Sequence, residues 1–184
     1  VLVVGLGESP LTRKDFIKVL KSLSSAMGNS KVKNVVIPFI EVEDADEAWI
    51  QTSTARVLKN ESYKVDKVGV QEEPSDIVLE AVNLYSKNNG ASEIQKGVAV
   101  ANGMALTREL GDLPPNICTP TYLADAAKSL AKTYNLKCEI LEESEMESLG
   151  MNSLLSVSKG SSQPGKLISL SYSNNGNAAP IVLV

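Results

Sequence analysis

The sequence predicts an α/β protein in which one long helix connects two α/β regions. Segments with apolar residues three and four positions apart alternate with short apolar runs along the chain. The decapeptide GDLPPNICTP, residues 111–120, interrupts this alternation with three prolines. The apolar runs VLVVGLG at residues 1–7 and PIVLV at residues 180–184 are typical of strands that are buried on both faces of a sheet.

The first region is predicted to open with a strand at residues 1–6 and a helix at residues 11–27. One face of that helix is apolar and carries Phe16, Leu20, Leu23 and Met27. A strand at residues 35–40 follows. Asp44, with Glu47 three residues later, has the form of a capping box and predicts the start of the next helix.

The end of the first region is less regular. Residues 63–70 predict a weak strand or a loop, and the pattern at residues 76–86 fits a helix or a strand equally well. Beyond them, residues 92–110 predict a long helix with Ser92 as its N-cap. Gly97 and Gly103 are predicted to be points of close packing or weak points in this helix, whose surface is rich in small residues: Ala99, Ala101, Gly103 and Ala105.

The proline-rich break separates this helix from the second region. Gly111 is predicted to end the long helix, and Pro114 with Pro115 prevents its continuation. Thr119 and Pro120 then supply an N-cap and a first-turn proline for the next helix. That helix carries an apolar face composed of Leu123, Ala127, Leu130, Ala131 and Tyr134. Four strands, at residues 136–141, 154–157, 167–172 and 181–184, and a short helix at residues 145–149 complete the prediction.

Composition excludes several classes of protein. The net charge is −4, and the lysines and arginines are scattered, which disfavours a dedicated nucleic-acid binder. There is no histidine, and Cys118 and Cys138 lack a CxxC spacing, so a zinc finger or a disulfide scaffold is not expected. No apolar run approaches the roughly 20 residues of a membrane span, and no signal peptide is recognisable. These features predict a soluble intracellular protein with reduced thiols.

Both ends of the sequence suggest a portion of a longer protein. The sequence opens on VLVVGLG without an initiator methionine and stops on PIVLV without a turn or a polar tail. Buried strands normally lead into a further element, so we expect polypeptide beyond both ends. The alternative is a complete chain whose terminal strands are central in the sheet.

Three local motifs invite a functional interpretation, and each has a simpler structural one. Gly5 and Gly7 form a GxG between a predicted strand and a predicted helix, but the third glycine of a dinucleotide fingerprint is missing, so a tight turn is favoured. The acidic stretches EVEDADE, residues 41–47, and EESEMES, residues 142–148, lack the pattern of a calcium loop and lie where helix N-termini favour carboxylates.

Nucleophilic catalysis is also not supported. Cys118 and Ser161 have no histidine as a base, and a pairing of Ser161 with Lys159 or Lys166 matches no known motif. The segment KGSSQPGK, residues 159–166, lacks the G-K-[ST] ending of a P-loop and is predicted to be a flexible, solvated loop.

The second half of the chain closely resembles the leucyl aminopeptidase (cytosol aminopeptidase) family of dimetal peptidases. The resemblance covers residues 97–184 and rests on the segments LPPNICTPTYLA and MESLGMNSLLSVSKGS and on the terminal PIVLV, in the order and spacing of that family. Residues 1–89 resemble the variable N-terminal domain of the same family through weaker motifs.

The resemblance implies a domain organisation. It predicts an incomplete, macro-like α/β domain at residues 1–90, a linking helix at residues 91–112, and the opening strands and helices of an α/β catalytic domain at residues 113–184. It also assigns a strand to residues 79–85. Because the family's metal ligands and catalytic residues lie beyond the strand that resembles PIVLV, no catalytic, cofactor-binding or metal-binding residue is expected in this chain, which should be inactive alone.

For the full-length enzyme, the resemblance implies a metalloaminopeptidase that releases N-terminal amino acids from peptides. Two divalent ions, manganese or zinc, would hold the substrate and activate a bridging water. Family members are cytoplasmic homo-hexamers, in which a partner surface could cover the small residues of the linking helix. Close packing there predicts that Gly103→Leu disturbs folding or assembly.

Two other functions remain open at this point. The N-terminal domain could be a binding module for a nucleotide or, as in some bacterial members of the family, for DNA. It could alternatively have a purely structural role in shielding the oligomer. The scattered basic residues give DNA binding little support.

Overall fold

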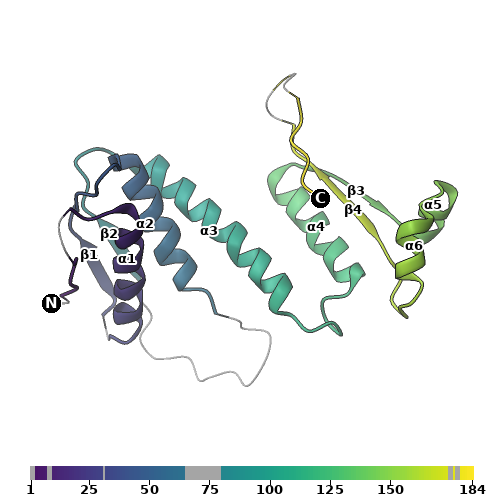
Figure 1. Cartoon of the computed structure of the whole chain (residues 1–184), viewed down its shortest axis with the longest axis horizontal. Coiled ribbons are helices and arrows are strands. Elements are labelled where there is room, and N and C mark those ends of the chain that lie inside the picture. The colour runs from purple at the N-terminus through teal and green to yellow at the C-terminus, as the bar shows by residue number, and fades with distance from the viewer. Residues whose placement is uncertain (1–2, 8–9, 31, 65–79, 174–175, 177–178) are drawn as a thin grey trace. The chain divides into compact units, whose positions relative to one another are not determined.

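The computed structural model describes residues 3–7, 10–30, 32–64, 80–173, 176 and 179–184. Helices and short strands are mixed along the chain, which confirms the predicted α/β class (Figure 1). The chain divides into two compact units, Val1–Asp112 and Leu113–Val184. The assignment of residues 1–90, 91–112 and 113–184 to functional domains stays a prediction.

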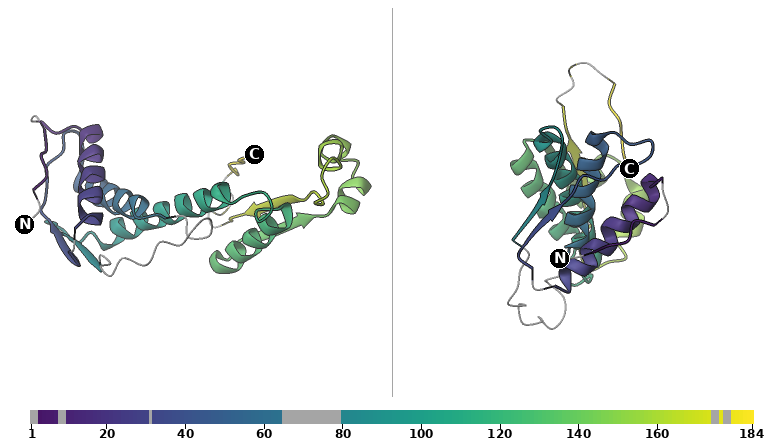
Figure 2. Two further views of the ribbon diagram at one scale, coloured as in Figure 1. Left: turned by 90° about the horizontal axis from the view of Figure 1, so that it is seen from below. Right: turned by 90° about the vertical axis from the view of Figure 1, so that its left-hand side faces the viewer.

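The first unit contains three helices and a two-stranded parallel sheet in its described part. The helices are α1 (Arg13–Gly28), α2 (Glu47–Glu61) and α3 (Ala91–Asp112), and the strands are β1 (Asn34–Ile37) and β2 (Ala81–Leu84). The two strands lie side by side in register from Asn34↔Ala81 to Ile37↔Leu84 (Figure 2). The strand predicted at residues 79–85 is therefore confirmed over the part that is described.

The core of this unit forms where α1 and α2 meet the loop that follows β1. Its buried members are Leu11, Phe16, Val19, Leu20, Val42, Ile50 and Val57. Phe16 and Leu20 belong to the predicted apolar face of α1, which is confirmed. The Phe16 and Trp49 rings contact each other at 6.0 Å between their centroids, so the aromatic pair joins α1 to α2.

Helix starts in this unit depend on side-chain caps, and two predicted caps are wrong. Asp46, not Asp44, caps α2, because its carboxylate accepts from the N–H of Trp49 at 2.8 Å, whereas Asp44 adopts a left-handed backbone with φ 55°. Helix α3 starts at Ala91, whose N–H donates to the side chain of Asn89 at 3.2 Å, so Ser92 already lies inside the helix.

Helices α2 and α3 pack closely at one glycine. A Cβ at Gly97 would overlap the carbonyl oxygen of Thr52 and lie 2.9 Å from the Cβ of Ala55. Close packing at Gly97 is therefore confirmed. At Gly103 nothing among the described residues lies within 4 Å of such an atom, which fits the alternative of a weak point in the helix. Close packing of Gly103 on a partner surface stays a prediction.

The second unit contains three helices and an antiparallel pair of strands among its described residues. They are α4 (Pro120–Tyr134), β3 (Lys137–Leu141), α5 (Glu143–Ser148), α6 (Asn152–Ser158) and β4 (Leu167–Ser171). Strands β3 and β4 pair in register from Lys137↔Ser171 to Leu141↔Leu167. Ala124, Ala127 and Ala131 form the buried face of α4.

The boundaries of α4 follow the predicted signals. Thr119 caps the helix by accepting from the N–H of Tyr122 at 3.3 Å, and Pro120 occupies its first turn. Asn135 ends it in the left-handed conformation with φ 54°, and its N–H donates to the carbonyl of Ala131. Asparagine tolerates this conformation better than most residues.

Three predicted strands are wrong. Residues 154–157 belong to helix α6, which buries Leu155 on one side and leaves Val157 80% exposed on another. Residues 3–6 and 181–184 form no strand among the described residues, where β1 pairs with β2 and β4 pairs with β3. Residues 1–2 of the first predicted strand lie outside the described residues. Residues 63–64 are irregular, and the rest of the predicted weak strand at 65–70 lies outside the described residues.

Candidate functional site

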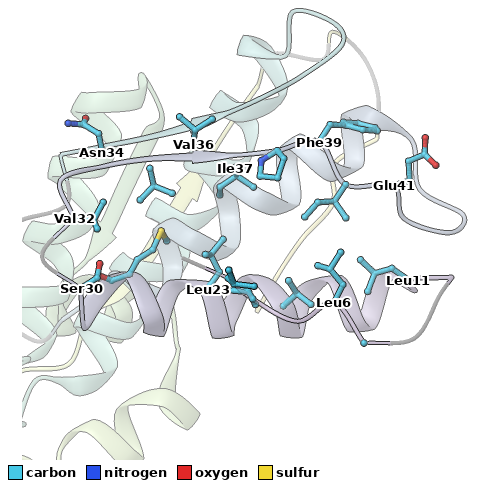
Figure 3. A pocket seen from close by; sticks show the side chains of 18 residues that line it. Leu6, Leu11, Leu23, Ser30, Val32, Asn34, Val36, Ile37, Phe39 and Glu41 are labelled. Atoms are coloured by element: carbon cyan, nitrogen blue, oxygen red, sulfur yellow. The ribbon is translucent and has the colours of Figure 1, made fainter. Parts of the chain in front are cut away.

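A large hollow of the first unit lies beside the GxG sequence. It is a groove of about 950 Å³ between residues 3–7, helix α1 and residues 32–41 (Figure 3). Leu6 and Leu23 lie on the helix side, and Val36 and Ile37 lie on the strand opposite. A volume of this size falls within the range of small-molecule sites in proteins.

The chemistry of this groove does not suit a phosphate. Its polar side chains are Ser30, Asn34 and Glu41, and no lysine or arginine is found among the described residues that line it. The Ser30 hydroxyl already donates to the carbonyl of Met27 at 2.8 Å. A nucleotide would therefore meet one carboxylate and an otherwise apolar wall, where burial of its charge is unfavourable.

Two nearby cations already have protein partners, and one of them, Lys87, contacts two residues of the groove wall. The Arg13 guanidinium donates to the carbonyl of Asp44 and lies 5.0 Å from the centre of the Trp49 ring. The Lys87 ammonium lies 4.5 Å from the centre of the Phe39 ring and 3.8 Å from the Glu41 carboxylate. Gly7 has φ +82°, a conformation that favours glycine, so the structural explanation of the GxG is the stronger one.

The first acidic stretch contributes one carboxylate that anchors a distant loop. Glu47 accepts from the backbone N–H groups of Lys87 at 2.7 Å and Asn88 at 3.2 Å, and from the Asn88 amide at 2.6 Å. The Ser86 hydroxyl also donates to it. These hydrogen bonds lower the pKa of Glu47 from 4.5 to about 2. The Ser86 hydroxyl makes the largest contribution, and the donors of Asn88 and Lys87 add to it.

The second acidic stretch combines a helix cap with a similar anchor. Glu142 and Glu145 form a capping box at the start of α5, as the capping interpretation predicts. Glu143 accepts from the N–H of Gly165 and from the hydroxyl of Ser158, both at 2.9 Å. These two donors, with Gly165 the stronger, hold the pKa of Glu143 below its ordinary value.

The lysines of KGSSQPGK are paired with these carboxylates. Lys159 donates to Glu147 at 2.6 Å, which raises the pKa of Lys159, and Lys166 donates to Glu142 at 2.6 Å. The loop is exposed at residues 161–164, as predicted for a solvated segment, but its two ends are fastened to α5. Neither lysine is therefore a free base for Ser161, whose hydroxyl accepts from the N–H of Gln163 at 3.0 Å.

Metal-binding and membrane-spanning features are not found among the described residues. Within that part of the chain, no three histidine, cysteine, aspartate or glutamate side chains gather in a way that could hold a metal ion. The thiols of Cys118 and Cys138 are free and partly buried. None of the described helices is both long enough and apolar enough to cross a bilayer.

Sequence reasoning interpreted the acidic stretches correctly as helix-start features but missed the two anchors. Glu47 reaches residues 40 and 41 positions away, and Glu143 reaches a residue 22 positions away. No local pattern signals such contacts. The one available hint is Gly165, a glycine two residues before a predicted strand, and a side chain at this buried position would meet Ser158.

Residues 105–184 match the model of the catalytic domain of the cytosol aminopeptidase family. The whole chain is 48% identical to a probable cytosol aminopeptidase of Vesicomyosocius okutanii subsp. Calyptogena okutanii, and spans 38% of that protein. It is 38% identical, again along its whole length, to the counterpart from Nitrosomonas eutropha, of which it spans 39%.

Solved structures show the same fold. The bottromycin maturation enzyme BotP in complex with Mn superposes with a TM-score of 0.80 at 23% identity, covering 94% of this chain and 36% of the enzyme. A mutant of tomato leucine aminopeptidase gives a TM-score of 0.78, also at 23% identity, over 90% of this chain and 34% of that protein. The resemblance predicted from the sequence is confirmed, and the chain spans a little over a third of the relatives it matches.

Proposed function

We propose that this chain is part of a cytoplasmic enzyme of the cytosol aminopeptidase family, which releases N-terminal amino acids from peptides. One observation carries the proposal: the similarity to probable cytosol aminopeptidases extends over all 184 residues, at 48% identity to one of them. The family model for the catalytic domain matches the second unit and the end of α3. Both regions therefore support the same assignment.

We place the two-metal centre of this enzyme, with manganese or zinc, in polypeptide that this chain does not contain. The described carboxylates do not gather in a way that could hold a metal ion, and Glu47, Glu142 and Glu143 are already bonded to N–H, hydroxyl or ammonium groups. A related fold has been solved with Mn, which supports a divalent ion for the whole enzyme. On this proposal the chain alone is inactive.

The role we assign to the second unit is to support the catalytic domain. Helix α4 packs on the β3–β4 pair through its buried alanine face. The anchor at Glu143 fixes the loop that leads into β4. A sheet extended from this pair would give the catalytic domain a rigid base on which to hold reactive groups.

Peptidase assays on two proteins test this proposal. The 184-residue chain and the full-length protein would each be purified and given leucine amide or a leucine peptide with Mn²⁺ or Zn²⁺. We expect metal-dependent release of leucine by the full-length protein and none by the chain. Cleavage by the chain alone, or an inactive full-length protein that still binds two metal ions, would contradict it.

The proposed homo-hexamer is tested separately by light scattering on the full-length protein. Helix α3 exposes Ile94, Val100 and Met104 in the isolated chain, where a partner surface could cover them. A monomeric full-length enzyme would contradict the hexamer without affecting the proposed activity. For nucleotide or DNA binding we find no favouring observation, since the groove beside the GxG lacks a cationic side chain among its described lining residues.

A further inference from the structure

Two Asn–Gly pairs lie in the described part of the chain, and their surroundings differ. Asn89 and Gly90 precede α3, whereas Asn102 and Gly103 lie inside it. Both asparagines are exposed. An asparagine followed by glycine can react with its own main chain, because glycine has no Cβ to shield its amide nitrogen from the preceding side chain. The chain therefore presents one chemistry in two different local structures.

The side chain of Asn89 is held by the first turn of α3. Its Oδ1 accepts from the N–H of Ala91 at 3.2 Å, two residues ahead. This hydrogen bond folds the side chain back along its own main chain and so brings Cγ close to the nitrogen of Gly90. The same N–H polarises the side-chain carbonyl and stabilises negative charge that develops on Oδ1. Asn89 thus holds an activated carbonyl beside a nucleophile.

The nitrogen of Gly90 is that nucleophile. The carbonyl of Gly90 accepts the first bond of α3, from the N–H of Ile94 at 2.9 Å, so Gly90 stands just before the helical residues. N–H groups at a helix start have no intrahelical acceptor, so that of Gly90 is not committed to α3. Inside α3, at Gly103, each N–H donates to the carbonyl four residues earlier, and side chains lean toward the helix start. The helix therefore protects Asn102.

Packing against α2 keeps glycine at position 90. A Cβ there would overlap the side-chain amide of Gln51. Gln51 is 3% exposed, and its amide donates to Ser86 and Glu47, so it is held in place. A larger residue would shield the amide nitrogen, but it cannot replace Gly90 without disturbing this contact. The fold therefore requires at position 90 the residue that leaves Asn89 reactive.

We propose that Asn89 is a site of spontaneous deamidation, in which the nitrogen of Gly90 bonds to Cγ of Asn89 and closes a succinimide ring. The side-chain amide leaves as ammonia, which takes up the proton lost from Gly90. Water, the one co-reactant, then opens the ring at either carbonyl and gives aspartate or isoaspartate at position 89. Aspartate keeps an acceptor for the N–H of Ala91, whereas isoaspartate adds a carbon to the main chain between β2 and α3.

Tryptic mapping separates the two pairs, because cleavage after Lys87, Lys96 and Arg108 gives the peptides 88–96 and 97–108. The full-length protein would be incubated in its folded state in mildly alkaline buffer and digested at intervals. We expect peptide 88–96 to gain the mass that distinguishes aspartate from asparagine about tenfold or more faster than peptide 97–108. An isoaspartyl methyltransferase would label isoaspartate in peptide 88–96. In protein unfolded with urea, the two peptides should convert at similar rates.

Asn89→Ser is the matched variant, because serine can accept from the N–H of Ala91 but carries no amide. Its peptide 88–96 should gain no mass, since the remaining Asn88 precedes a residue with a Cβ and donates to Glu47 at 2.6 Å. A gain of mass in this variant would place the reaction at another residue and overturn the proposal. Equal rates for the two peptides of the folded protein, or conversion of peptide 88–96 only after unfolding, would overturn it as well.

Discussion

In both units a glutamate holds a distant loop, but the strand pairs of the two units differ. In each, one glutamate near the start of a helix accepts hydrogen bonds from a segment far along the chain: Glu47 holds residues 86–88, and Glu143 holds Gly165. The first unit builds a parallel pair of strands, whereas the second builds an antiparallel one.

This difference explains why the groove is found in the first unit. A parallel pair requires a crossover between its strands and neighbours on its edges, whereas an antiparallel pair can be stable with one face open to water. The first unit therefore keeps an apolar groove beside β1. The anchors show that in both units tertiary carboxylate contacts fix loops whose sequences specify no regular structure.

The largest expected effect is at the α2–α3 contact. Gly97→Leu should destabilise the first unit by about 3 kcal/mol or more, because the added atoms overlap the backbone of α2 at Thr52. Urea unfolding followed by Trp49 fluorescence measures this. Gly103→Ala is the control: it has open space around it and should stabilise the helix by up to about 1 kcal/mol. Equal effects at both glycines would contradict the close contact.

The Glu47 anchor should make the first unit sensitive to acid. The folded pKa of Glu47 is about 2, below its ordinary 4.5, so its stabilisation is present above about pH 4.5 and is lost as the pH falls toward 2. A Glu47→Gln variant should be less stable at pH 7 and should lose less stability between pH 4.5 and pH 2 than the unsubstituted chain. Parallel stability curves for the two proteins would show that the anchor contributes nothing.

The Glu143 anchor should have a more local effect in the second unit. Glu143→Gln weakens the bonds to Gly165 and Ser158, so the amide of Gly165 should exchange faster while the fluorescence of Trp49 is unaffected. Glu139→Gln serves as the control, because the Glu139 carboxylate forms an exposed ion pair with Lys137, a kind of contact that contributes little to stability. Unchanged exchange of Gly165 in the Glu143→Gln variant would count against the anchor.

The smallest expected effect compares helix caps in the two units. Thr119→Ala should cost about 1 kcal/mol by removing the acceptor for Tyr122 N–H, and Thr12→Ala a similar amount at α1, where it accepts from Asp15 N–H. Thr→Ser at either position should restore most of the loss. Thermal unfolding followed by circular dichroism measures both variants. A cost much larger at one position would indicate that its hydroxyl has a further role.

Helices were more predictable than strands in both units, and the reason is the range of the contacts involved. The boundaries of α4 follow from Thr119, Pro120 and Asn135, because capping and proline effects act within one helical turn. The prediction of a strand at residues 154–157 is wrong, because a short apolar run fits a strand as well as a buried turn of helix. The predictions of strands at residues 3–6 and 181–184 are wrong, because a strand forms only where a partner strand pairs with it, and local sequence does not specify that partner.

The candidate sites show the same difference between short-range features, which the sequence predicts, and long-range contacts, which it does not. From sequence alone, the GxG, the acidic stretches and KGSSQPGK could each be given a structural explanation. The described geometry agrees with it for the GxG and the acidic stretches, and for the exposed residues 161–164 of KGSSQPGK, whereas Lys166 is ion-paired and mostly buried. The sequence could not identify Glu47 or Glu143 as the particular anchors. Their partners lie tens of residues away, and which of several neighbouring glutamates reaches them depends on the packing of α2 and α5.

The sequence by itself determined the helix pattern, the break at residues 111–120 and the resemblance to the cytosol aminopeptidases, because these are recorded in local spacing and in motif order. Tertiary structure alone decided which apolar runs become strands, which glycine lies in a helix contact and which carboxylates hold loops. Each of those outcomes depends on atoms that become neighbours only when distant parts of the chain pack together.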